Sequence, residues 1–159
     1  MENNFVNDEW YLKIAMEQSD KANRLGEVPV GAIVVDENGK VIGEGYNTKE
    51  KTHDPTGHAE IIAIKNAAKN LNNWRLSNCT LYVSLEPCPM CMASLSQARI
   101  KRVVFGAYDP KGGALSLGYF IHRDKRLNHR FQVTGGLNHY TCSKVLSSFF
   151  KERRKGYKK

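Results

Sequence analysis

The sequence predicts an α/β fold in which a mixed five-stranded sheet carries helices on both faces. Between residues 58 and 107, helical and strand-like segments alternate, which favours parallel neighbouring strands joined by helices. Ahead of them, strand-like runs at residues 30–35 and 40–46 flank Asn38-Gly39, a dipeptide typical of antiparallel hairpins. The hairpin and the alternating segments together predict strands of both orientations in one sheet.

The other elements follow from apolar periodicity and from the residues that end helices. A stripe formed by Trp10, Leu12, Ile14 and Ala15 predicts a first helix over residues 8–25, ended by Gly26. The remaining expected elements are helices at 58–70, 89–98 and 140–154, strands at 80–85, 102–107 and 131–134, and a loop with one short helix at 108–130.

Composition points to one soluble domain over residues 1–159. The chain has no internal repeat or low-complexity linker, and no apolar run approaches the roughly 18 residues of a membrane span. No secretory signal is recognisable at the start, so we expect a cytoplasmic location without membrane contact. The net charge is +8, and residues 151–159 hold six basic residues and one acidic residue. Such a basic tail attracts phosphates, although many basic tails only increase solubility.

Two short motifs carry the residues suited to chemistry. His58-Ala59-Glu60 precedes a predicted helix, and Cys88 and Cys91 lie between a strand end and a helix start. Two thiolates and one imidazole are three zinc ligands, and a catalytic zinc site leaves the fourth position for water. If His58 and Glu60 both lie in the first helical turn, they can face one cleft, and Glu60 can then act as the base.

The alternative interpretation of these residues is a closed structural zinc site. Its fourth ligand would come from Cys79, Cys142, His53 or another side chain. Cys79 begins a strand-like run, which favours a buried free thiol instead. The combination H-x-E followed by P-C-x-x-C is the signature of zinc-dependent deaminases.

The chain resembles the bacterial tRNA-specific adenosine deaminases of the cytidine/deoxycytidylate deaminase superfamily over nearly its whole length. The segments that carry the resemblance are residues 26–32, 54–60, 85–88, 103–107 and 127–130. The resemblance implies a three-layer α/β/α, cytidine-deaminase-like fold, one zinc ion per subunit and a homodimer. It also implies hydrolysis of the wobble adenosine to inosine in the anticodon loop of a tRNA.

The resemblance further implies a role for individual residues. Zinc on His58, Cys88 and Cys91 would activate a water, and Glu60 would transfer its proton. The residues expected to contact the substrate are Asn47, Val30, Ala59, Asp109, Asn128, Phe149 and Arg153. Phosphate contacts are expected from Arg123, Lys125, Arg126, Arg130 and the basic tail, and Phe150 is a second candidate for stacking.

Several of these residues also fit purely structural roles. Asn47 and Asp109 are typical turn residues, Val30 suits a core position, and Phe149 and Phe150 suit a buried helix face.

Two other functions share parts of the pattern. The metal motif alone also fits a deaminase of free guanine or cytosine, and a closed metal site would fit an RNA-binding module without turnover. Residues 27–30, residues 128–130 and the basic tail favour the RNA substrate over a free base.

Overall fold

The computed structural model describes residues 4–156, so the last three residues of the predicted basic tail lie outside it. Five strands form one sheet in the order β2-β1-β3-β4-β5. Their bounds are β1 Gly31–Val35, β2 Val41–Tyr46, β3 Thr80–Leu85, β4 Arg102–Ala107 and β5 Gln132–Thr134. β1 pairs antiparallel with β2 and β3, whereas β3, β4 and β5 are parallel, which confirms the predicted mixed sheet.

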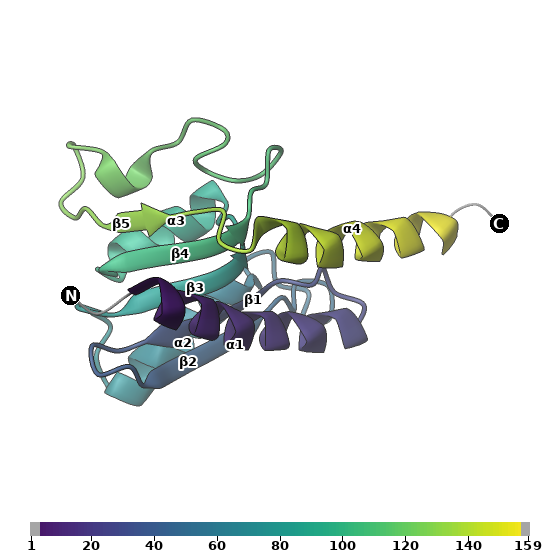
Figure 1. Ribbon diagram of the computed structural model, residues 1–159. Coiled ribbons are helices and arrows are strands. Elements are labelled where there is room, and N and C mark those ends of the chain that lie inside the picture. The colour runs from purple at the N-terminus through teal and green to yellow at the C-terminus, as the bar shows by residue number, and fades with distance from the viewer. Residues whose placement is uncertain (1–3, 157–159) are drawn as a thin grey trace.

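Helices cover both faces of this sheet (Figure 1). One face carries α1 (Asn4–Arg24) and α4 (His139–Gly156), and the other carries α2 (Ala59–Leu71) and α3 (Pro89–Gln97). A short 3-10 helix, η1 (Ile121–Arg123), lies in the long segment between β4 and β5. The arrangement confirms the three-layer α/β/α fold. Within residues 4–156, none of the helices combines the length and apolar character needed to cross a lipid bilayer.

The central strands are buried on both faces because successive side chains point to opposite layers. Val34, for example, packs in the cluster that includes residues of α2 and α3. Its neighbour Ile33 packs with Ala15 of α1 on the other side. This double burial explains why these strands are continuous apolar runs rather than alternating ones.

The predicted elements all occur, with bounds that differ by up to four residues. One expectation for the first helix was wrong. Trp10 is 64% exposed, whereas Leu12 and Ala15 are fully buried. Residues two apart on a helix point about 200° apart, so Trp10 cannot share a face with Leu12. Ser19, four residues after Ala15, completes the buried face instead.

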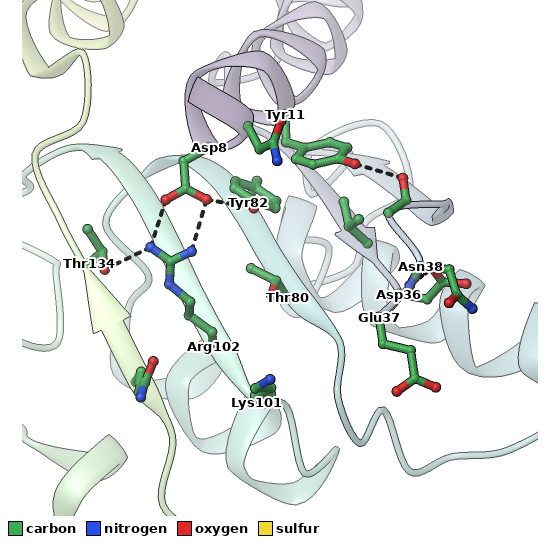
Figure 2. Close-up of a pocket in the computed structure, with 14 residues that line it drawn as sticks. Asp8, Tyr11, Asp36, Glu37, Asn38, Thr80, Tyr82, Lys101, Arg102 and Thr134 are labelled. Atoms are coloured by element: carbon green, nitrogen blue, oxygen red, sulfur yellow. Dashed lines mark hydrogen bonds and ion pairs between the residues drawn. The ribbon is translucent and has the colours of Figure 1, made fainter. Parts of the chain in front are cut away.

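A polar network fastens the start of α1 to the sheet (Figure 2). The buried carboxylate of Asp8 accepts hydrogen bonds from both terminal nitrogens of Arg102, at 2.9 and 2.7 Å, and from the Tyr82 hydroxyl at 2.8 Å. Arg102 also donates to Thr134 on β5. Burial and the bond to Asp8 raise the pKa of Tyr82. A cleft surrounds this network at the end of the sheet where the parallel strands begin. Because the buried charges of Asp8 and Arg102 pair with each other, we assign the network a structural role.

Candidate metal centre and substrate cleft

Two helix starts bring the metal-binding side chains together. His58 is the N-cap of α2 and Cys88 the N-cap of α3, and both have extended backbone conformations. Pro89 occupies the first position of α3, where a missing N–H costs no hydrogen bond, and Cys91 follows in the first turn. The free N–H groups and the dipole at such helix starts favour thiolate charge. Both predicted helix starts are therefore confirmed.

The spacing of the three ligand atoms fits a tetrahedral zinc ion. His58 Nδ1 lies 3.6 Å from Cys88 Sγ and 3.5 Å from Cys91 Sγ. Zinc bonds of about 2.3 Å to sulfur and 2.0 Å to nitrogen, at tetrahedral angles, place the nitrogen about 3.5 Å from each sulfur. His58, Cys88 and Cys91 thus match three corners of a zinc site. In the described part of the chain, no other histidine, cysteine, aspartate or glutamate joins this group of ligand atoms. Cys79 and Cys142 are buried elsewhere.

The ionisable groups of the centre influence one another. A hydrogen bond from the Cys91 thiol lowers the pKa of Cys88 to about 4, and the same bond raises the pKa of Cys91. The hydrogen bond with Cys88 also raises the pKa of His58. The centre therefore stabilises negative charge on Cys88, and a thiolate is the form of cysteine that binds a metal.

Glu60 is the second residue of α2 and only 4% exposed. Burial raises the pKa of its carboxyl group, and the nearby His58 and a hydrogen bond with Cys91 act in the opposite direction. A carboxyl group whose pKa is shifted upwards accepts and releases a proton more readily near neutral pH. Beside the metal cluster, this is the property that a proton-transfer residue needs.

Asn47 connects the end of β2 to the start of α2. Its Oδ1 accepts a hydrogen bond of 2.8 Å from the backbone N–H of Ala59, and its own N–H donates to the Val30 carbonyl at 3.1 Å. Ala59 and Val30 are both buried in the main core cluster. Asn47 therefore satisfies a free N–H group at the helix start, while contacts of these three residues with a base stay a prediction.

A second cleft, of about 780 Å³, lies between α4 and the carboxyl ends of β3 and β4. Asp109, Phe150 and Arg153 line it, and one wall begins at Leu85, three residues before Cys88. Phe149 is not among the lining residues. Its ring instead packs edge-on against Phe150 and lies under the guanidinium of Arg153, 5.2 Å away. Phe150, at 44% exposure, therefore faces the cleft, and stacking of a base on Phe149 or Phe150 stays a prediction.

Asn128 and the basic residues around it lie outside this cleft. Nε2 of the neighbouring His129 lies 2.6 Å from the carbonyl oxygen of Ile100. Ile100 stands just before β4 begins, so it lies at the end of the sheet opposite to Cys88. Arg126 pairs with Asp124 at 2.7 Å in the same loop. Within the described chain, Asn128 does not line the cleft.

Sequence reasoning gave no role to two buried carboxylates, Glu27 and Glu86, each only 2% exposed. Glu27 accepts hydrogen bonds from the backbone N–H groups of Glu50 and Lys51, at 3.2 and 2.6 Å, and so holds the loop that leads to His58. Glu86 similarly holds residues of the loop after β4. The available signal in the sequence was that both glutamates stand beside apolar segments. A carboxylate buried there needs hydrogen-bond partners, which indicates a structural role.

A three-layer fold that presents a His/Cys/Cys group and a buried glutamate at two helix starts is that of a zinc-dependent deaminase. Residues 6–107 match the family model described as the cytidine and deoxycytidylate deaminase zinc-binding region. The chain therefore belongs to the cytidine and deoxycytidylate deaminase family, within its tRNA-specific adenosine deaminase branch.

Three relatives support this placement. A Haemophilus influenzae protein named tRNA-specific adenosine deaminase is 50% identical over 147 residues, which cover 92% of this chain and 85% of the relative. A Bacillus subtilis protein of the same name is 43% identical over 93% of this chain and 91% of its own length. A structure from a study of A-to-I editing by tRNA A34 deaminases at the wobble position has a TM-score of 0.82 at 38% identity, covering 87% of this chain and 99% of that one.

Proposed function

We propose that the protein hydrolyses the wobble adenosine in the anticodon loop of a tRNA to inosine and ammonia. The observation that carries this proposal is the zinc-compatible spacing of His58, Cys88 and Cys91 beside the buried Glu60. The activity named for the relatives supports the choice of substrate. Since tRNA is a cytoplasmic substrate, we also propose a cytoplasmic location.

The chemistry follows from the residues of the centre. Zinc, when bound, lowers the pKa of a water molecule so that it is a nucleophile near neutral pH. Because the two cysteine thiolates offset much of the metal charge, a nearby base is needed, and Glu60 is the buried carboxyl group in position. Glu60 takes one proton from the water that attacks C6 of adenine and delivers it to the ring nitrogen. It then moves the remaining hydroxyl proton to the amine, which departs as ammonia. Water and adenine thereby become hypoxanthine and ammonia.

Features of the cleft suit a single-stranded RNA loop. Phe150 offers an exposed ring for stacking, and Arg153 and Arg154 line the same cleft with positive charge. Anticodon bases are unpaired, so the enzyme can accept a splayed base without opening a duplex. We propose that Asp109 lies near the nucleotide backbone, on the wall that faces α4.

The experiment is to incubate the zinc-loaded protein with an anticodon stem-loop that has a wobble adenosine, with guanine, and with cytosine. We expect inosine from the stem-loop only. In Glu60→Gln the rate should fall by about 10²- to 10⁴-fold with the zinc content unchanged, as expected when a general acid-base is removed. Glu50→Gln, in an exposed loop, is the matched control and should keep the parent rate. Turnover of a free base without inosine, or no turnover at all, would contradict the proposed function.

We further propose that the protein is a homodimer that uses the loop after β4. Three apolar side chains of this loop, Leu117, Tyr119 and Phe120, are 44–54% exposed, which is unusual for neighbouring residues of a monomer surface. We expect Tyr119→Asp to convert a dimer into a monomer in sedimentation experiments. Trp10→Asp, which changes an exposed aromatic residue on α1, should stay dimeric. Equal sedimentation of both variants and the parent would count against this interface.

A further inference from the structure

We propose that Glu86 is a positioning residue that fixes the loop of residues 109–116 against the metal-binding segment and thereby sets one wall of the RNA cleft. The proposal rests on the proposed function, because it concerns how the substrate is held. Glu86 takes no part in the proton transfers assigned above. It is nevertheless almost fully buried, two residues before Cys88.

The contacts of Glu86 all lead to this loop. One carboxylate oxygen, Oε1, accepts a hydrogen bond of 3.0 Å from the backbone N–H of Asp109 and one of 2.5 Å from the Ser116 hydroxyl. The other, Oε2, accepts a bond of 2.9 Å from the backbone N–H of Ser116. A single side chain therefore joins both ends of the loop.

The backbone adds two further links beside the carboxylate. The N–H of Glu86 donates to the Ala107 carbonyl at 2.8 Å, and the N–H of Ala114 donates to the Pro87 carbonyl at 2.8 Å. Gly113 lies so close that a Cβ atom at this position would collide with the Glu86 carboxyl group. The loop is thus packed directly on the residues that lead to Cys88, and glycine at position 113 permits the approach.

The part of the loop held in this way faces the cleft. Asp109 and Lys111 line it opposite Phe150 and Arg153 of α4. Asp109 also accepts hydrogen bonds from the backbone N–H groups of Lys111 and Gly112, at 3.2 Å each, which keeps the turn compact. A change at Glu86 would therefore move the cleft wall as a unit, without removing any metal ligand.

A carboxylate suits this position because every partner is a donor. Glutamine offers one acceptor oxygen, and its NH₂ group would face an N–H group of Asp109 or Ser116. A buried N–H group left without an acceptor is destabilising, so the loop should loosen in Glu86→Gln. Since the cleft wall holds nucleotides away from the reacting atoms, the change should weaken substrate binding more than it slows the chemical step.

The test compares Glu86→Gln and Gly113→Ala with Asp8→Asn, a matched variant in which a buried, multiply bonded carboxylate is changed far from the cleft. For each we would measure zinc content, KM and kcat for the anticodon stem-loop, and amide hydrogen exchange. In the two loop variants we expect KM to rise about tenfold, kcat to stay within about twofold and exchange to accelerate across residues 109–116. Asp8→Asn should lower the melting temperature and leave KM unchanged.

The outcomes separate this proposal from the proposed function. Equal KM values in Glu86→Gln and the parent, or an equal rise in Asp8→Asn, would overturn the positioning role. A kcat that falls in proportion to zinc content would overturn it as well, since Glu86 would then act on metal binding. Absence of inosine from the parent protein would instead contradict the proposed function, and the exchange rates would still decide whether Glu86 holds the loop.

Discussion

Asn47 has one observed structural contact and one predicted contact with the substrate. Its Oδ1 accepts the N–H of Ala59 at the start of α2, and its NH₂ group is the donor that we propose for the substrate base. Aspartate keeps the acceptor but lacks the NH₂ donor, whereas alanine lacks both. Substitutions at this residue should therefore distinguish structural support from substrate contact.

We expect Asn47→Ala to lower the free energy of unfolding by about 1–3 kcal/mol, because the buried N–H of Ala59 loses its acceptor. Asn47→Asp should stay within about 1 kcal/mol of the parent, since a carboxylate at a helix start is favourable. Both variants should lose most of the inosine formation. Denaturant titration and the stem-loop assay check the two effects, and parent-like activity of Asn47→Asp would contradict the base contact.

At the scale of elements, the position of α2 depends on its close approach to β2. A Cβ atom at Gly43 would collide with the Ala63 carbonyl oxygen and lie 2.7 Å from the Ala67 nitrogen. A Cβ atom at Gly45 would similarly collide with the backbone of Ala59, directly after His58. Glycine on the strand and alanine on the helix therefore let the two backbones touch, and this contact sets where the metal-binding helix begins.

Gly43→Ala should accordingly lower the free energy of unfolding by about 1–3 kcal/mol, the usual cost of overpacking a tight core. Gly156→Ala is the matched control, because a Cβ atom there meets nothing within 4 Å and alanine favours a helix. Urea unfolding of the two variants measures the difference. An unchanged midpoint for Gly43→Ala would mean that α2 can move away from β2 at little cost.

Elements were predictable from the sequence where one local signal determined them. The Asn-Gly turn, the apolar runs of β3 and β4, and the H-x-E and P-C-x-x-C motifs at helix starts all rest on residues close together in the chain. The side-by-side pairing of β1 with β3 did not follow from such signals. Nor did the roles of Glu27 and Glu86, whose partners lie 23 to 30 residues away in loops without periodicity.

At the scale of the whole molecule, charge is distributed unevenly. Residues 151–159 supply five of the eight net positive charges. The described part of this segment belongs to α4, which extends beyond the carboxyl ends of the parallel strands (Figure 1). Arg153 and Arg154 line the cleft there. The positive charge of α4 thus lies at the end of the sheet that holds the metal centre, where it can attract an RNA backbone.

This arrangement predicts a position-specific salt dependence of RNA binding. We compare two triple variants of equal net charge, K151Q/R154Q/K155Q on α4 and K13Q/K65Q/K69Q on α1 and α2. Each phosphate contact with single-stranded nucleic acid contributes about 0.7 to the slope of log affinity against log salt. The α4 variant should therefore reduce the slope by about 2, and the control should change it little. Equal reductions in both variants would mean that only the total charge attracts the RNA, and that α4 does not contact its phosphates.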